Sequence, residues 1–238
     1  MNFLKSRGGL KKSDRGFTLV EMLVVIAIMS ILMTAGAIGI GGMGGKGVTS
    51  GVASAGSMFE EARTMAIGQR TKTRILVAKS LTNNPADNLR RILIVSEEID
   101  SVTLLPRPGS WILSSRGVTL PDQTFFSETF SKKDQDKAGP IDTMTLSNVK
   151  ASYAGDYYYY EFNAEGIYTL GASAPSTFVI GAGVRPPNAG ATVKPKVAGS
   201  GKRDFGGFVV WRNGWVSVFR SPDQMDSSIA SIQAGTTF

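Results

Sequence analysis

The sequence contains no cysteine and no histidine among its 238 residues. These absences exclude structural disulfides, thiol nucleophiles, histidine-containing metal sites and every catalytic triad that needs an imidazole base. Serines and carboxylates are present, but no spacing groups them into a Ser–Lys pair or a carboxylate dyad. We therefore expect no enzymatic activity and no cofactor, and we expect packing alone to stabilise the fold.

Positive charge is concentrated at the N-terminus. The formal net charge is +7. The first 16 residues hold one acid, Asp14, and five bases: Lys5, Arg7, Lys11, Lys12 and Arg15. Subtracting their excess of four leaves +3 on the remaining chain, which is weak grounds for an acidic or nucleic-acid partner. The basic character therefore indicates a targeting segment.

An uncharged run extends from Met22 to Ile40. Together with residues 17–20 it is about long enough to span the roughly 30 Å hydrocarbon core of a bilayer as a helix. Basic segments stay on the cytoplasmic side of such a helix. We therefore predict a single-pass protein of the cytoplasmic (inner) membrane, with its N-terminus inside and the bulk of the chain outside.

Glu21 is the one charged residue between Phe17 and Ile40. A carboxylate in a membrane helix is unfavourable, so it usually has a partner and a task. If the chain is cut after Gly16, the new α-amino group of Phe17 lies about one helical turn from Glu21. The amine of a neighbouring subunit, displaced along a filament, would neutralise this carboxylate and set the axial register.

The stretch Gly16-Phe17-Thr18-Leu19-Val20-Glu21, followed by the apolar run, resembles the class III signal of type IV prepilins and type II secretion pseudopilins. The resemblance implies that prepilin peptidase cuts between Gly16 and Phe17 and methylates Phe17, and that Glu21 is needed for assembly. The implied partners are sister subunits, an inner-membrane assembly platform, and membrane lipid before assembly. An ordinary signal peptide cut after Ala37, or an uncleaved anchor, is the alternative, but neither explains Glu21.

Residues beyond the apolar run predict one further helix and then β structure. Thr49 to Gln69 carries apolar residues at helical spacing, namely Val52, Ala55, Phe59, Ala62 and Ala66. The glycines Gly39, Gly41 and Gly44 imitate a dinucleotide fingerprint but lack its βαβ context, so we expect a flexible stretch in a long helix.

Eight short runs favour strands, separated by breaks such as 106–109, and Asn213-Gly214 predicts a two-residue hairpin turn. The eight runs are Thr73–Ala78, Arg91–Ser96, Ser110–Leu113, Thr143–Leu146, Tyr157–Asn163, Thr177–Ile180, Phe208–Trp211 and Trp215–Phe219. The aromatic run should alternate, with Tyr158, Tyr160 and Phe162 on one face.

The fold class that we predict is α+β and pilin-like, with a long N-terminal helix, transmembrane in its first half, packed on a mainly antiparallel β head. The expected domains are a leader over 1–16, an anchor and amphipathic helix over 17–70, and a globular head over 71–238. Within the family, Phe59-Glu-Glu-Ala-Arg63-x-x-Ala66 and the strand after it resemble the H-type (GspH/FimT-like) minor pseudopilins. Three further short segments are similar to those proteins: Trp111 with Gly117-Val118, the turn from Phe162 to Gly166, and Gly214-x-Val216. Two segments, 125–139 and 184–207, are longer than in those proteins.

Two loops carry charges that invite a binding hypothesis. Asp134-x-Asp136 imitates the start of a calcium loop but lacks later ligands, so we expect a solvated loop and no metal. The Gly/Pro-rich stretch 184–207 holds Lys194, Lys196, Lys202 and Arg203, which would contact nucleic-acid phosphates or an acidic sister subunit. The predicted function is that of a structural, minor subunit of a pilus-like or pseudopilus filament, in the periplasm or at the cell surface. The alternative is a minor pilin that binds DNA or a surface.

Overall fold

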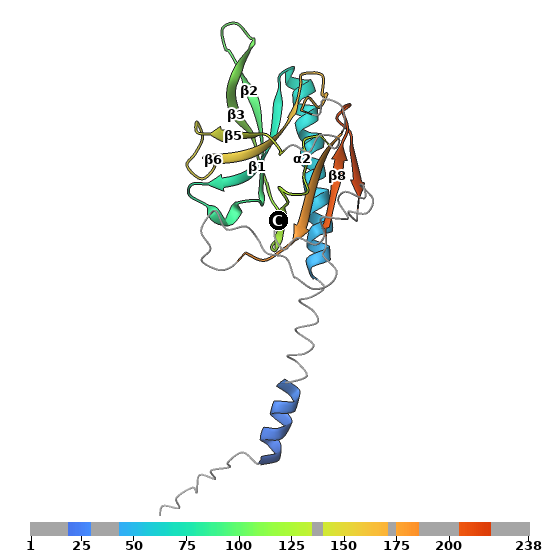
Figure 1. Cartoon of the computed structure of the whole chain (residues 1–238). Helices are drawn as coiled ribbons and strands as arrows, with labels where there is room; N and C mark the ends of the chain where they lie inside the picture. Colours follow the sequence, from blue (N-terminus) through green and yellow to red (C-terminus); the bar gives the residue numbers. More distant parts are fainter. Residues whose placement is uncertain (1–18, 30–42, 135–139, 171–174, 186–204, 220–238) are drawn as a thin grey trace, which may run out of the picture. The chain divides into compact units, whose positions relative to one another are not determined.

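The computed structural model describes residues 19–29, 43–134, 140–170, 175–185 and 205–219. The chain divides into two units, residues 1–42 and 43–238, and each is described by itself. In the first unit, residues 19–29 form a helix. In the second, helix α2 (Met43–Gln69) is followed by strands that form two antiparallel sheets (Figure 1).

The larger sheet has five strands in the order β3-β2-β1-β6-β5, and the smaller has four in the order β4-β7-β8-β9. A 3-10 turn, η1 (Pro85–Asp87), separates the first two strands. The strands are β1 (Thr73–Leu81), β2 (Arg91–Ile99), β3 (Pro106–Thr119), β4 (Thr124–Phe126), β5 (Thr143–Leu146), β6 (Gly155–Phe162), β7 (Ser176–Ala182), β8 (Phe205–Val210) and β9 (Val216–Phe219). The predicted α+β class with an antiparallel β head is confirmed.

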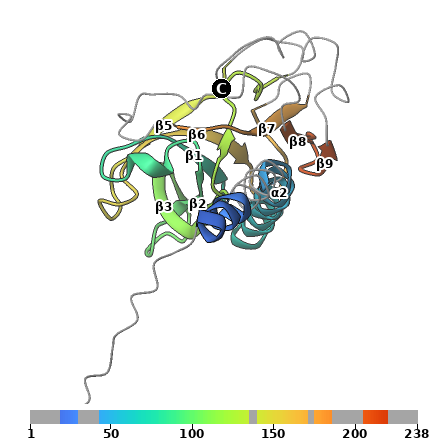
Figure 2. The same ribbon diagram turned by 90° about the horizontal axis from the view of Figure 1, so that it is seen from below.

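Helix α2 is buried along the face that its periodicity predicts. Val52, Ala55, Phe59, Ala62 and Ala66 are all buried. The helix lies where the two sheets come together and contacts both of them (Figure 2). Because one apolar stripe faces two sheets, a single helix closes the main core of the head.

The helix begins earlier than expected, at Met43, so it includes Gly44, and the flexibility of this stretch stays a prediction. A glycine further along the helix permits close packing. A Cβ on Gly51 would lie 2.8 Å from Ile180 Cδ1 and 3.3 Å from Thr124 Cγ2. The first turns of α2 therefore approach the smaller sheet closely. A continuous helix over 17–70 stays a prediction, since residues 30–42 lie outside the described ones.

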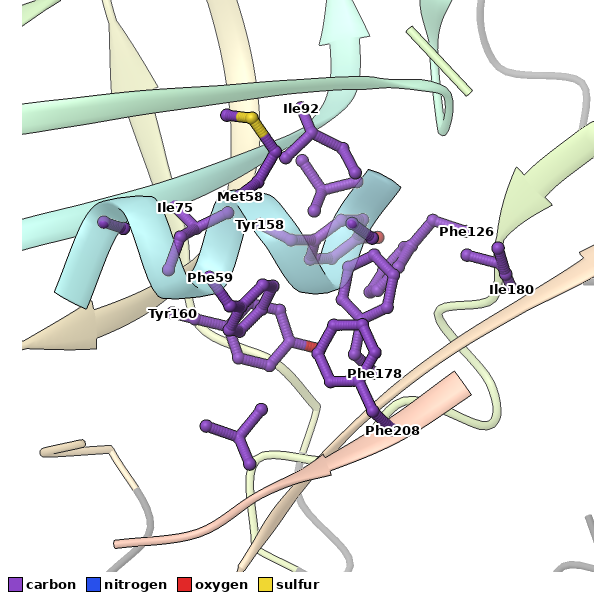
Figure 3. Packing of buried hydrophobic residues seen from close by; sticks show 14 of the residues in the cluster. Met58, Phe59, Ile75, Ile92, Phe126, Tyr158, Tyr160, Phe178, Ile180 and Phe208 are labelled. Carbon is purple, nitrogen blue, oxygen red and sulfur yellow. The ribbon is translucent and has the colours of Figure 1, made fainter. Parts of the chain in front are cut away.

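Aromatic rings fill the centre of the core. The Phe59 ring lies 5.1 Å from Tyr160 of β6, 5.5 Å from Phe178 of β7 and 4.9 Å from Phe208 of β8, always edge to face (Figure 3). Phe178 and Phe208 stack in parallel at 4.9 Å. Edge-to-face pairs add roughly 0.5–1.5 kcal/mol each beyond the burial of area. One residue of α2 therefore joins both sheets.

The predicted alternation along the aromatic run is confirmed. Tyr158, Tyr160 and Phe162 belong to the core under α2, whereas Tyr157 and Tyr159 pack on the opposite, outer face of the larger sheet. That outer face is also apolar, and its buried residues are Leu76, Ala78, Leu81, Leu93, Val95, Leu146 and Tyr157. The larger sheet therefore has two apolar faces.

Two local expectations are wrong. The expected break at 106–109 lies within β3, which accommodates its prolines because it is an edge strand that, among the described strands, pairs only with β2. The second concerns a turn: between Val210 and Val216, only Gly214 has a positive φ (+82°). The segment 125–139, predicted to be longer than in the H-type proteins, begins inside β4, whose Phe126 is fully buried.

The turn joining β8 and β9 has three residues rather than two. Trp211 N–H donates to Trp215 O at 2.9 Å, and Gly214 N–H donates to Trp211 O at 2.9 Å. This pattern is that of a tight turn followed by a glycine in the left-handed region. The pairing is consequently displaced by one residue from the expected register.

Replacing Phe59 with alanine should destabilise the head by about 3–5 kcal/mol, because it leaves a cavity against both sheets. All three tryptophans lie in the head, so their fluorescence during urea unfolding of the detergent-solubilised full chain measures the change. Ser57→Ala, at an exposed position of the same helix, is the control and should shift the free energy by less than about 0.5 kcal/mol. A similar effect of both substitutions would contradict the central role of Phe59.

Candidate functional site

The helix over residues 19–29 is apolar on all its sides. Successive residues point about 100° apart around a helix. Leu19, Val20, Met22–Ile26, Ile28 and Met29 together cover the whole circumference, and each of these large side chains is between 46% and 83% exposed. A helix that is hydrophobic all round needs lipid or other helices around it. This segment therefore has the surface of an assembly element.

Glu21 is the one charged residue of this helix, and it is exposed. Gly16 and Phe17, the predicted processing site, lie outside the described residues. Within the described part of the chain, no helix is long and apolar enough to cross a membrane. The predicted pairing of Glu21 with a neighbour's amine and the single-pass topology stay predictions.

On the outer face of the larger sheet, Arg74 lies between two aromatic rings. Its guanidinium carbon Cζ is 4.0 Å from the ring centroid of Trp111 and 4.0 Å from that of Tyr159. Nε and Nη2 each lie 2.7 Å from Glu161 Oε2. The side chain of Glu161 is only 8% exposed and that of Arg74 is 18% exposed. Thr169 Oγ1 donates to the other carboxylate oxygen of Glu161 at 3.1 Å.

This cluster joins β1, β3 and β6 through ring stacking and an ion pair. The guanidinium of Arg74 stacks on two rings and pairs with the nearly buried carboxylate of Glu161, an arrangement that holds these side chains in place. Trp111 also lines a cleft of about 360 Å³ between the end of β3 and β5, together with Pro108–Ser110 and Met144–Asn148. Among the described residues, no three Asp or Glu side chains gather as metal ligands would.

The residues of the two predicted loop sites are only partly described. Lys194, Lys196, Lys202 and Arg203 lie outside the described residues, as does Asp136. Asp134 is buried, so the expected solvated loop is wrong at that position.

Arg185, which belongs to the same basic stretch, has a structural role in the head. It donates to the backbone carbonyls of Pro85 at 2.9 Å and Asn88 at 2.7 Å, and its Cζ lies 5.2 Å from the Phe125 ring. Burial, and secondly the charge of Arg90, lower the pKa of its guanidinium.

Comparison with protein-family models gives one match, the prokaryotic N-terminal methylation motif, over residues 11–37. The chain carries a class III signal. No curated protein and no solved structure matches the chain.

The class III signal indicates a pilin-like protein that is processed by prepilin peptidase, anchored in a membrane and assembled with other pilins. The matched range contains Gly16, Phe17 and Glu21. Sequence reasoning found these three because they are neighbours in the chain. It missed the Arg74 cluster, whose members come from strands far apart in sequence. Their local signal is a charged residue next to an apolar or aromatic run: Arg74 precedes Ile75–Ala78, and Glu161 follows Tyr157–Tyr160.

Replacing Glu161 with alanine should lower the free energy of unfolding by about 3 kcal/mol, because it leaves the nearly buried Arg74 without its counter-charge. Tryptophan fluorescence during urea unfolding of the full chain measures the loss. Asp122→Ala is the control: Asp122 also pairs with an arginine, Arg90, but is 95% exposed, and its loss should cost less than about 1 kcal/mol. Equal effects would show that the cluster is no more than a surface ion pair.

Proposed function

We propose that the protein is a structural, minor subunit of a type IV pilus-like or type II secretion pseudopilus filament. Prepilin peptidase cuts it between Gly16 and Phe17, the new N-terminus is methylated, and the helix that follows carries it into the filament. The observation that supports this most is the helix over 19–29, which is apolar on every side and holds one carboxylate at its start. Its function is assembly and not catalysis.

The placement of Glu21 supports an electrostatic role in assembly. An apolar helix bundle excludes water, so an unpaired charge inside it is strongly disfavoured. The mature amine of Phe17 lies four residues before Glu21, and methylation keeps its positive charge. A subunit that enters the bundle at the correct height brings its amine against the carboxylate of a neighbour. Other heights leave both charges unpaired, so the pair selects one axial register.

The packing of the head supports the H-type minor subgroup. Three islands of resemblance, 59–66, 162–166 and 214–216, meet around one side chain of α2. Arg63 Cζ lies 5.7 Å from the Trp215 ring. A Cβ on Gly166 would lie 3.2 Å from Arg63 Cγ, and one on Gly214 would lie 2.7 Å from Arg63 Cδ. A side chain at Gly166 or Gly214 would therefore collide with the side chain of Arg63. This contact is one structural reason why the three separate segments of resemblance occur together.

The proposed topology follows from charge and hydropathy. The basic leader stays in the cytoplasm, the apolar run enters the inner membrane, and the head lies outside before the assembly platform builds the subunit into a filament. The head then meets sister subunits or cargo.

The mass and N-terminal sequence of the protein purified from membranes test the processing. We expect the chain to begin at Phe17 and to carry one methyl group on its amine. A start after Ala37 would identify an ordinary secreted protein, and an intact Met1 would identify a plain anchor. The variant Phe17→Ser changes the residue that would be methylated but keeps Gly16, the residue before the cut. In the same measurement it therefore reports on cleavage and on methylation separately.

Replacing Glu21 with alanine should leave membrane insertion intact and reduce incorporation into filaments by roughly 10²- to 10³-fold. The reason is that each misplaced or unpaired amine in the bundle costs about 3–5 kcal/mol. Immunoblots of sheared filaments and of membranes, compared per cell, measure both quantities. Glu21→Asp keeps the charge and should retain most of the incorporation. Normal incorporation of the alanine variant would overturn the pairing argument.

A further inference from the structure

The hairpin between β2 and β3 projects beyond the body of the head (Figure 1). The pairing of β1 with β2 ends at Thr73↔Ser96, whereas the pairing of β2 with β3 continues to Ile99↔Pro106. Residues 97–111 therefore form a two-stranded ribbon whose end has no third strand beside it. We call residues 99–105 the tip.

The tip presents large apolar side chains to solvent. Val102 is 88% exposed, Leu104 is 76% exposed and Leu105 is 64% exposed. Burying these side chains against an apolar surface of a partner is favourable. Three such residues within four positions form a patch, and patches of this kind mark interaction sites more often than scattered single residues do.

The tip is rigidly built. Asp100 Oδ1 accepts the backbone N–H groups of Val102 at 2.8 Å and of Thr103 at 3.1 Å. Asp100 Oδ2 accepts Nε of Arg107 at 2.9 Å and its Nη2 at 2.6 Å. Leu104 has φ +55°, a conformation that a bulky residue adopts at an energetic cost. The loop therefore holds its apolar side chains outward instead of folding them back.

The carboxylate of Asp100 keeps this loop closed over the physiological pH range. The N–H groups of Thr103 and Val102, and then Arg107, hold the pKa of Asp100 below its ordinary value of 3.8. A lowered folded pKa means that the ionised group stabilises the loop above pH 3.8 and loses this effect as the pH falls through the folded pKa.

The charges beside the tip and the prolines of its edge strand restrict which partners can bind to the ribbon. Arg107 lies 3.8 Å from Glu98 and also pairs with Asp100, so these three groups leave one net negative charge beside the tip, while residues 101–105 carry none. Pro106 and Pro108 lie on β3, the edge strand, and have no N–H to donate to an added strand. The ribbon is therefore suited to insertion of its tip into an uncharged depression and not to pairing along its edge.

We propose that the tip inserts into an apolar depression on the head of a different pilin-like subunit in the same filament. This inference rests on the proposed function. The tip extends past the end of α2 at Gln69, while the N-terminal segment enters at Met43, so the tip points away from the attachment of the anchor (Figure 1). Next to the first turns of α2, near Gly47, the head carries the Arg90–Asp122 ion pair, which does not match an apolar tip on a second copy.

The size of the tip also favours a neighbour within a filament. Three side chains provide far less than the roughly 800 Å² per partner that a stable complex in solution buries. Such a contact is effective where another interaction already holds the partners close together, because the second contact is then intramolecular. The apolar N-terminal helices of assembled subunits supply that first interaction.

Thiol labelling of Val102→Cys in the full chain tests the proposal directly, since the natural sequence has no cysteine. A membrane-impermeant maleimide is applied to filaments and to membranes of cells that carry Glu21→Ala in addition. We expect labelling in filaments to be at least about tenfold slower than in the unassembled chain. Lys150→Cys, at an exposed position outside the ribbon, is the control and should react equally in both.

Each outcome of the labelling decides the proposal. Equal labelling of Val102→Cys in both samples would show a free tip and overturn the docking while leaving the proposed function intact. Slow labelling already in the unassembled chain would mean insertion into lipid, which also overturns it. Absence of the chain from filaments despite an intact Glu21 would overturn the proposed function and this inference together.

A triple variant measures the contribution of the contact. Val102→Ser, Leu104→Gly and Leu105→Ser remove the apolar side chains, and glycine relieves the positive φ at 104. We expect an unchanged urea-unfolding midpoint and membrane level, with incorporation into filaments reduced about tenfold or more. Val218→Ser removes another apolar side chain, 61% exposed, and should incorporate normally. Full incorporation of the triple variant would overturn the proposal.

Discussion

The contact of Phe59 with rings from both sheets is the interaction on which the head depends. No hydrogen-bonded pairing joins the two described sheets into one, and no cysteine is available for a disulfide. Packing holds the sheets together, through direct contacts such as Tyr160 with Phe178 and through α2, whose Phe59 lies at the centre of the aromatic core. The N-terminal segment joins the head at Met43, the start of this helix. A force applied through that segment consequently enters the head through the helix that closes its main core.

Local patterns predicted the elements that form from their own periodicity. The buried stripe of α2 was predictable because its spacing alone specifies which face is apolar. The alternation of Tyr157 to Phe162 was predictable for the same reason. Strand β4 was not, because three residues have little pattern of their own and their pairing partner, β7, lies more than fifty residues later (Thr124↔Ala182). Turn length at Gly214 was missed because Asn-Gly permits two registers, and the pairing of Val210 with Val216 selects one.

The candidate sites also divide into those that a local sequence pattern could predict and those that it could not. Gly16, Phe17 and Glu21 could be named from sequence because the proposed peptidase and neighbouring subunit would act on a continuous segment, which the matched methylation motif contains. Arg74 and Glu161 could not be paired, because β1 and β6 become neighbours only in the folded sheet (Arg74↔Glu161). The tip was missed for another reason. The two prolines that follow it, Pro106 and Pro108, indicated a break, and only the edge position of β3 explains how they fit within a strand.

The apolar helix over residues 19–29 and the tip have different capacities for recognition. A helix such as 19–29, apolar on every side, packs against any similar helix, and a paired charge at Glu21 adds register but little choice of neighbour. Specificity requires a feature that a wrong partner cannot satisfy. The tip is such a feature, since Asp100 and Arg107 hold three apolar side chains in one geometry and a charged acceptor would leave its own groups unpaired. In the filament that we propose, helix packing would therefore provide the strength of assembly, and the head would determine which subunit stands next to which.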